Sequence, residues 1–158
     1  AGGAARAVLS VLCMIPERPS LIKIYDIDEQ RAKGLILDLG KNFNVEGVEA
    51  VQGVDDLNIE LADLLINVTP IGMKSTDVPL VSEELLHSNL FVYDVIYNPA
   101  QTALLKMAQQ KGAKASNGLG MLFYQGVLAF QHWAGLELSE AVKKKMKAAL
   151  DKGLKQKG

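Results

Sequence analysis

Residues 64–73, Leu-Leu-Ile-Asn-Val-Thr-Pro-Ile-Gly-Met, contain the feature that decides the fold. A short apolar run that ends at polar residues and a proline is typical of a strand buried on both faces of a parallel sheet. Residues 91–95, Phe-Val-Tyr-Asp-Val, repeat the pattern. Weaker β-rich runs predict further strands at 21–25, 48–51 and 114–116.

Helices are predicted between these strands. Apolar residues three and four positions apart indicate helices at 4–15, 29–39 and 102–110. Parallel strands joined by helical crossovers form a doubly wound sheet. We therefore predict an α/β fold with a doubly wound parallel sheet of the Rossmann-like kind. Two C-terminal helices, at 119–134 and 139–152, follow it without a strand between them.

The length and composition exclude several classes of protein. The chain has 158 residues, enough for one sizeable domain, and its net charge of −1 shows no basic excess for nucleic acid. One cysteine and two histidines exclude a disulfide framework and make a metal site improbable, and they suit the reducing cytoplasm. No strand precedes the glycines at positions 2 and 3, so we expect a longer protein in which the first strand lies before residue 1.

Two stretches of the sequence have features that suit contact with a membrane. Residues 118–136 lack a formal charge and are long enough to span a bilayer. They contain Gln125, Gln131, His132 and four glycines, which a lipid-facing helix tolerates poorly, so we predict a buried helix and no membrane contact. The lysine-rich end from residue 143 predicts the solvated face of a last helix.

The candidate binding residues follow the predicted strands, where ligands of parallel sheets sit. Gly2 and Gly3 open a helix, and such a helix start favours a phosphate because its N–H groups are unpaired. Asp26 ends the next strand, where a carboxylate accepts hydrogen bonds from an adenosine ribose. Asp26 or Asp28 equally suits the cap of the following helix.

Three further side chains have two interpretations each. Asn67 and Thr69 lie in a rigid loop with Pro70, where they either line a cleft or form an ordinary turn. The phenol of Tyr97, after the next strand, either lies at the edge of the same cleft or only packs against the protein with its hydroxyl in water. Gln125 is either a core amide bonded to the backbone or a contact to a substrate hydroxyl.

Five ordered motifs together resemble the shikimate/quinate dehydrogenase family over nearly the whole chain. They are Ala-Gly-Gly-Ala-Ala-Arg at 1–6, Asn-Val-Thr-Pro-Ile-Gly-Met at 67–73, Asp-Val-Ile-Tyr-Asn-Pro at 94–99, Thr-Ala-Leu-Leu at 102–105, and Asn-Gly-Leu-Gly-Met-Leu at 117–122 with Gln125. The resemblance implies reversible NAD(P)-dependent reduction of 3-dehydroshikimate to shikimate, or the equivalent quinate reaction, in aromatic amino-acid biosynthesis.

The resemblance also implies roles for individual residues. It places the cofactor's pyrophosphate on the first four residues and its adenosine ribose near Asp26. The loop after residue 66 would line the cofactor groove, and the nicotinamide would lie near Val95. The cofactor residues implied are Ala1, Gly2, Gly3, Ala4, Asp26, Ile27, Arg31, Asn67, Thr69, Pro70, Val95, Gly118 and Met121, and the substrate residues are Tyr97 and Gln125.

The sequence departs from the family pattern in two respects. Members that use NADP carry Asn-Arg-Thr where this chain has Asp26-Ile27-Asp28, and a carboxylate repels the 2′-phosphate. NAD is therefore the expected cofactor, with NADP still open through Arg31. The family's catalytic Lys and Asp come from an N-terminal substrate domain outside this sequence, so no catalytic residue is predicted.

The domain organisation follows from the same resemblance. Residues 1–117 form the cofactor domain, and residues 118–158 return to pack on the N-terminal domain. This packing predicts an exposed apolar patch on these helices when that domain is absent.

Two other functions compete with this prediction. A related dehydrogenase, such as glutamyl-tRNA reductase, is disfavoured by the motifs at Tyr97 and Gln125. A stand-alone module that senses NAD without turnover is the alternative from another class. The sequence leaves open shikimate against quinate, the direction of flux, and whether the protein is a homodimer.

Overall fold

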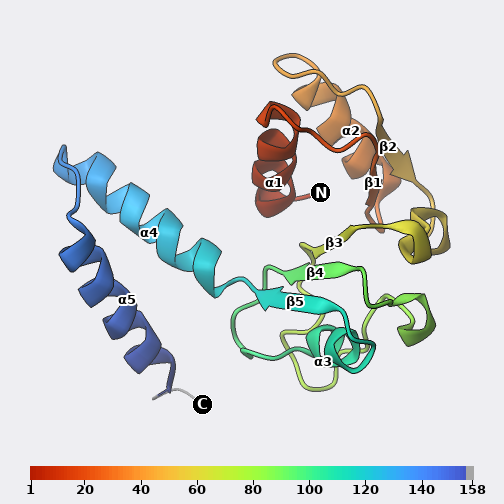
Figure 1. The fold of residues 1–158 in the computed structure, drawn as a ribbon. Helices are drawn as coiled ribbons and strands as arrows, with labels where there is room; N and C mark the ends of the chain where they lie inside the picture. The colour runs from red at the N-terminus through yellow and green to blue at the C-terminus, as the bar shows by residue number, and fades with distance from the viewer. Residues whose placement is uncertain (156–158) are drawn as a thin grey trace.

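The fold alternates short parallel strands with flanking helices, which confirms the predicted α/β class (Figure 1). It is seen in a computed structural model that describes residues 1–155, so the last three residues of the predicted lysine-rich end lie outside it. The strands are β1 (Ile22–Tyr25), β2 (Val48–Val51), β3 (Leu64–Asn67), β4 (Phe91–Asp94) and β5 (Lys114–Asn117). The α-helices are α1 (Gly3–Met14), α2 (Glu29–Leu39), α3 (Ala103–Gln110), α4 (Leu119–Ala134) and α5 (Glu140–Lys155).

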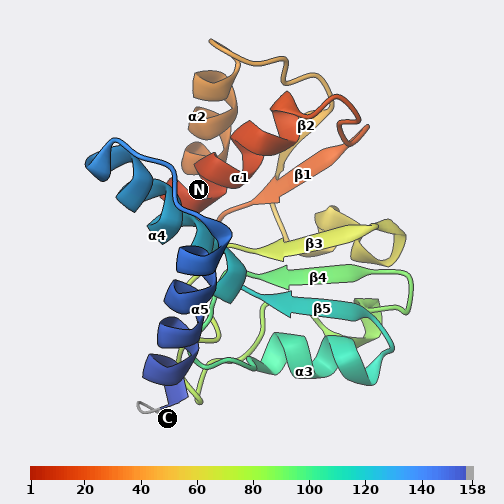
Figure 2. The same cartoon turned by 60° about the vertical axis from the view of Figure 1, so that its left-hand side comes forward.

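The strands form two separate parallel sheets rather than one. β1 pairs with β2, with Ile22 opposite Val48. The second sheet has the order β3-β4-β5. Figure 2 shows the two sheets side by side, with β1 and β3 facing each other. Within residues 1–155 no strand pairs with both, so the predicted single sheet is interrupted at this point.

Side-chain hydrogen bonds cap the starts of α2 and α3 but not that of α1. Asp28, not Asp26, caps α2, because its side chain accepts a hydrogen bond from the Gln30 N–H at 3.1 Å. Thr102 caps α3 by accepting from Leu105. α1 begins at Gly3 without a capping side chain. Its N-terminal N–H groups are therefore not used by a side chain.

Two apolar cores support the sheets. The larger lies around β4 and α3 and contains nine buried residues: Ile59, Val81, Leu86, Leu90, Val92, Leu104, Leu105, Ala108 and Ala113. The smaller joins α1 to α2 through Ala5, Leu9, Leu35 and Leu39. β1 contributes Ile22 and Ile24 to the smaller core, but both side chains remain half-buried.

The last two helices project from the body of the molecule (Figure 1). The prediction of a buried helix over 118–136 is wrong, because Val127 is the only buried residue of α4. Trp133 is 82% exposed, and the exposed set on α4 also includes Met121, Tyr124, Leu128 and Phe130. Charge-free composition indicated burial, but nothing in residues 1–155 covers this face. The exposed apolar patch predicted for these helices is present.

No helix within the described residues combines the length and apolar character needed to cross a membrane.

Candidate functional site at the carboxyl ends of the strands

Three polar residues lie side by side where three neighbouring strands end. Asn67, Asp94 and Asn117 are the last residues of β3, β4 and β5, and the strand register places them directly opposite one another. Each side chain bonds to the loop or helix that follows a strand. This row therefore shapes the edge of the sheet at which parallel folds bind ligands.

Asp94 is the centre of the row and is fully buried. One carboxylate oxygen accepts hydrogen bonds from the Asn67 side-chain amide and from the Ile96 N–H, both at 3.1 Å. The other accepts from the Thr102 hydroxyl at 2.7 Å. A buried carboxylate requires such donors. Asp94 thereby fixes the loop after β3, the loop after β4 and the start of α3 relative to one another.

The loop after β3 is held by its own side chains. The Asn67 side-chain oxygen accepts from both the N–H and the hydroxyl of Thr69, and its NH₂ donates to the Ile71 carbonyl at 3.1 Å. The Thr69 hydroxyl accepts from the Ile71 N–H. Both predicted side chains therefore form a structured turn. Pro70, the residue after Thr69, is exposed at the surface.

The far end of this loop is closed by Asp77. Its carboxylate accepts from the Gly72 N–H at 2.9 Å and the Lys74 N–H at 3.0 Å. These backbone donors, that of Lys74 first, lower the pKa of Asp77 below its usual value. Gly72 has a φ of 113°, a conformation that favours glycine.

The close packing between the ends of β4 and β5 requires glycine at position 118. A Cβ atom there would lie 1.9 Å from the Val95 carbonyl oxygen. The Gly118 N–H donates to Ile96, and the Val95 N–H donates to Asn67. The Gly118 carbonyl accepts from the Leu122 N–H. Among the backbone hydrogen bonds of the described residues, none ends at the Val95 carbonyl, so this oxygen can accept from a ligand.

The helix start predicted to bind phosphate lies beside the end of β1. The backbone nitrogen of Ala1 lies against the carboxylate of Asp26. A Cβ atom added at Gly2 or Gly3 would meet nothing within 4 Å, so the space in front of α1 is open. The first helical hydrogen bond runs from the Arg6 N–H to the Gly2 carbonyl, and the preceding N–H groups point out of the helix end.

The segment after β1 carries the predicted ribose contacts. The Asp26 side chain is 16% exposed and accepts from the Asp28 N–H at 2.9 Å. Arg31 lies with its Nε 3.5 Å from the Asp28 carboxylate, and Ile27 is 95% exposed. Asp26 thus orders the turn and faces the start of α1, but the cap of α2 is Asp28 and not Asp26. The contact of Asp26 with a ribose stays a prediction.

The predicted substrate residues both have exposed side chains. Tyr97 follows β4, and Gln125 lies on α4, whose first turn follows β5. The interpretation of Gln125 as a core amide is wrong, because it is exposed and donates to the Leu122 carbonyl of its own helix. Met121 is also partly exposed, and its backbone lies by the Tyr93 hydroxyl, whose pKa is raised by burial.

Sequence reasoning missed Asp94 and Asn117 as determinants of the site. The available signal was position, because each occupies the last residue of an apolar strand run in the same way as Asn67. Among residues 1–155, no three His, Cys, Asp or Glu side chains gather as a metal site.

Known proteins are similar to this chain in sequence and in fold. A shikimate dehydrogenase (NADP(+)) from Methanocaldococcus jannaschii is 41% identical over 156 residues, which cover 96% of this chain and 53% of that protein. In sequence and fold, the chain is a relative of the shikimate dehydrogenases. It spans about half the length of the curated relatives it matches. No protein-family model matches it.

Two solved structures extend the relationship with shikimate dehydrogenases. Quinate dehydrogenase from Corynebacterium glutamicum in complex with NAD matches with a TM-score of 0.81 and 31% identity, covering 94% of this chain and 51% of that one. Shikimate 5-dehydrogenase from Listeria monocytogenes in complex with shikimate and NAD matches with a TM-score of 0.75 and 28% identity, covering 92% of this chain and 53% of that one.

Proposed function

We propose that this chain forms the cofactor-binding half of a shikimate or quinate dehydrogenase. The observation that carries the proposal is the meeting of three features at one edge. The open start of α1, the Asp26 carboxylate and the row formed by Asn67, Asp94 and Asn117 all lie at the carboxyl ends of the strands (Figure 2). The names of the relatives support the reaction class.

The residues present fit a dinucleotide. The open space before Gly2 and Gly3 admits a pyrophosphate to the N–H groups of α1, and the helix dipole favours its charge. Asp26 is placed to accept ribose hydroxyls, with Ile27 beside it. The loop from Asn67 to Pro70 and the Val95 carbonyl would border the nicotinamide end. When bound, the cofactor supplies the hydride that is exchanged with the substrate.

Tyr97 and Gln125 are proposed to hold the substrate. Both side chains are exposed, and they offer a phenol and a carboxamide to the hydroxyl or carboxylate groups of the substrate. Reduction of a carbonyl also needs a proton donor within hydrogen-bond reach. We propose that an N-terminal substrate domain supplies it, and that this domain covers the apolar face of α4.

The experiment is a matrix of cofactors and substrates on the purified full-length protein. NAD or NADP is combined with shikimate or quinate, and initial rates are measured for each of the four pairs. We expect turnover with at least one pair. Absence of turnover with all four, in a protein shown to be folded, would contradict the proposed activity and favour a non-catalytic NAD-binding module.

Preference for NAD is a separate part of the proposal. Asp26 faces the start of α1, and a second acid, Asp28, holds Arg31, so a 2′-phosphate would meet two carboxylates. Repulsion of about 1 kcal/mol or more at this distance corresponds to about fivefold or more in kcat/KM. We expect Asp26→Asn to lower the ratio of kcat/KM for NAD to kcat/KM for NADP by about that factor.

The matched control for this variant is Asp38→Asn, a carboxylate on α2 that pairs with Arg6 and Lys41 away from the end of β1. It should leave the ratio unchanged. If the unaltered protein already prefers NADP, as the names of the curated relatives suggest for those proteins, the assignment of Asp26 as the discriminating group is wrong.

A further inference from the structure

The side chain of Asn117 links two segments that each carry one of the proposed substrate residues. Its NH₂ group donates to the Ala100 carbonyl at 2.8 Å, and its oxygen accepts from the Leu119 N–H at 3.1 Å. Ala100 lies three residues after Tyr97 in the chain. Leu119 is the first residue of α4, the helix that carries Gln125. A single carboxamide therefore joins the Tyr97 segment to the start of α4.

The segment that carries Tyr97 is also held on both sides of this residue. Before it, the Ile96 N–H donates to the Asp94 carboxylate at 3.1 Å. After it, the Thr102 hydroxyl donates to the same carboxylate at 2.7 Å. Asn117 contacts the stretch between these two points. The backbone around Tyr97 is thus fixed before any substrate is bound.

The two hydrogen bonds of Asn117 differ in what they contribute. The bond from Leu119 alone would be a local turn at the start of a helix, which asparagine commonly forms. The bond to Ala100 reaches 17 residues back along the chain. Ala100 is exposed, so water can replace Asn117 as the partner of its carbonyl. The second bond therefore adds little to stability, but it fixes where the segment lies against α4.

We propose that Asn117 is a positioning residue of the substrate site, which sets the place of the Tyr97 phenol relative to the Gln125 carboxamide. This inference rests on the proposed function, in which both of those side chains hold the substrate. Asn117 acts through them and not by its own contact with the substrate. Misplacement of binding groups by about 1 Å can cost about a hundredfold in rate, so a bond of small energy can have a large effect on turnover.

A variant at this position should still fold. In Asn117→Ala the backbone bond from the Gly118 N–H to the Ile96 carbonyl, at 3.1 Å, still joins the end of β5 to the segment after β4. The buried carboxylate of Asp94 also keeps its three donors. Ser116→Ala is the matched control, because Ser116 is the preceding residue of β5 and is exposed.

The first test measures geometry and needs no turnover. Backbone ¹⁵N order parameters of residues 97–101 are compared among the unaltered full-length protein, Asn117→Ala and Ser116→Ala. We expect them to fall from about 0.85, typical of rigid backbone, towards about 0.6 in Asn117→Ala, and to stay unchanged in Ser116→Ala. Unchanged values in Asn117→Ala, or an equal fall in both variants, would overturn the proposal.

The second test uses the pair of cofactor and substrate that the unaltered protein turns over. Asn117→Ala should lower kcat/KM for the substrate by about tenfold or more. KM for the cofactor should stay within about threefold, because the proposed pyrophosphate and ribose contacts lie at α1 and after β1. Ser116→Ala should change neither value. An equal rise in both KM values, or no change in either, would contradict a positioning role in the substrate site.

A double-mutant cycle shows whether Asn117 acts through Tyr97. Tyr97→Phe removes the hydroxyl, so the addition of Asn117→Ala should lower kcat/KM by less than about a further threefold. A further tenfold loss would show that the two residues act independently, against the proposal. If the unaltered protein turns over no pair, the proposed function fails, and the order parameters still decide whether Asn117 holds the segment.

Discussion

β4 and β1 are parallel strands of four residues each, yet they have very different surroundings. β4 is paired on both edges, and its Val92 and Asp94 are fully buried. Within residues 1–155, β1 is paired on one edge only, and none of its residues is buried. Similar apolar runs therefore reach different burial, because the neighbours on both edges, and not the strand itself, exclude water.

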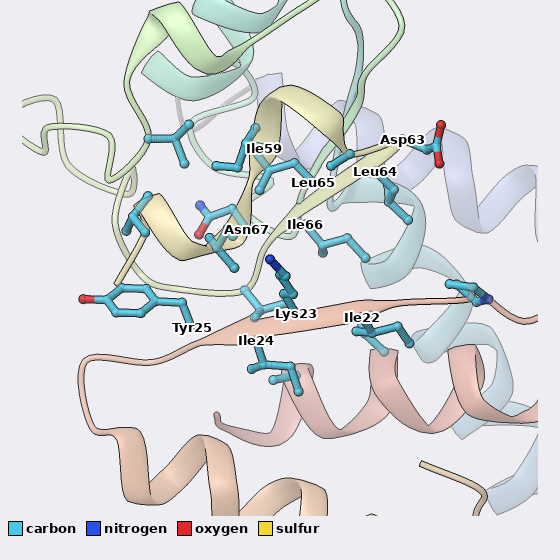
Figure 3. A pocket seen from close by; sticks show the side chains of 18 of the residues that line it. Ile22, Lys23, Ile24, Tyr25, Ile59, Asp63, Leu64, Leu65, Ile66 and Asn67 are labelled. Carbon is cyan, nitrogen blue, oxygen red and sulfur yellow. The ribbon is translucent and has the colours of Figure 1, made fainter. Parts of the chain in front are cut away.

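The same contrast separates the two halves of the candidate site. The ends of β3, β4 and β5 are locked by the buried Asp94, while the end of β1 depends on Asp26 and the start of α1. The first half is held by short internal hydrogen bonds. The second half borders an apolar groove that lies between β1 and β3 and is lined by Tyr25 and Leu64 among others (Figure 3). The predictions below test this difference, from the largest effect to the smallest.

Loss of the Asp94 carboxylate should have the largest effect. Asp94→Ala leaves three donors around a buried site without their acceptor, and we expect a loss of about 3–5 kcal/mol in the free energy of unfolding. Chemical denaturation of the full-length protein measures it. Thr102→Val removes one donor and keeps the shape, so it should cost less. An equal or smaller loss in Asp94→Ala would contradict the central role of this carboxylate.

The apolar core and the groove can be compared directly with two leucines. Leu90 is 1% exposed in the larger core, and Leu90→Ala should cost about 2–5 kcal/mol. Leu64 is 39% exposed at the groove in residues 1–155. Leu64→Ala should therefore cost less than Leu90→Ala, and an equal loss would contradict this comparison. A loss of under about 1 kcal/mol would indicate that Leu64 stays at an open surface.

The apolar face of α4 is a second open surface and has its own test. If the N-terminal domain covers it, Trp133→Ser should lower the stability of the full-length protein by about 2 kcal/mol, as expected for a buried large side chain. Lys144→Ser on the neighbouring α5 is the control and should be neutral. Equal, negligible effects of both variants would show that Trp133 remains in water.

The smallest expected effect is local and depends on pH. The pKa of Asp77 is lowered in the folded protein by the N–H groups of Lys74 and Gly72, so its carboxylate stabilises the loop above its unfolded value of 3.8 and loses this effect as the pH falls below it. Amide exchange at Gly72 and Lys74, corrected for intrinsic rates, should accelerate below about pH 4. Asp77→Asn should remove this acceleration. A pH-independent rate of amide exchange in the unaltered protein, after correction for intrinsic rates, would show that the Asp77 carboxylate does not hold the loop.

Much of the fold was predictable because its signals are local. The apolar runs ending at residues 25, 68 and 95 identified strands within one residue of their observed ends, and the helix at 29–39 was predicted with its observed bounds. Local hydrogen-bonding chemistry also indicated a polar, shaped loop at Asn67–Pro70. The sequence could not choose between Asp26 and Asp28 as the cap of α2, because both satisfy the same local pattern.

The sequence by itself determined which residues form strands, which strands end in polar side chains, and the family that these motifs resemble. Only the tertiary structure decided that Asn67, Asp94 and Asn117 lie in one row, because strand register is a long-range property. It likewise showed that the apolar face of α4 is exposed, because nothing in residues 1–155 covers it. It also showed the groove between β1 and β3, since burial and hydrogen bonding depend on what packs beside a strand and not on its own residues.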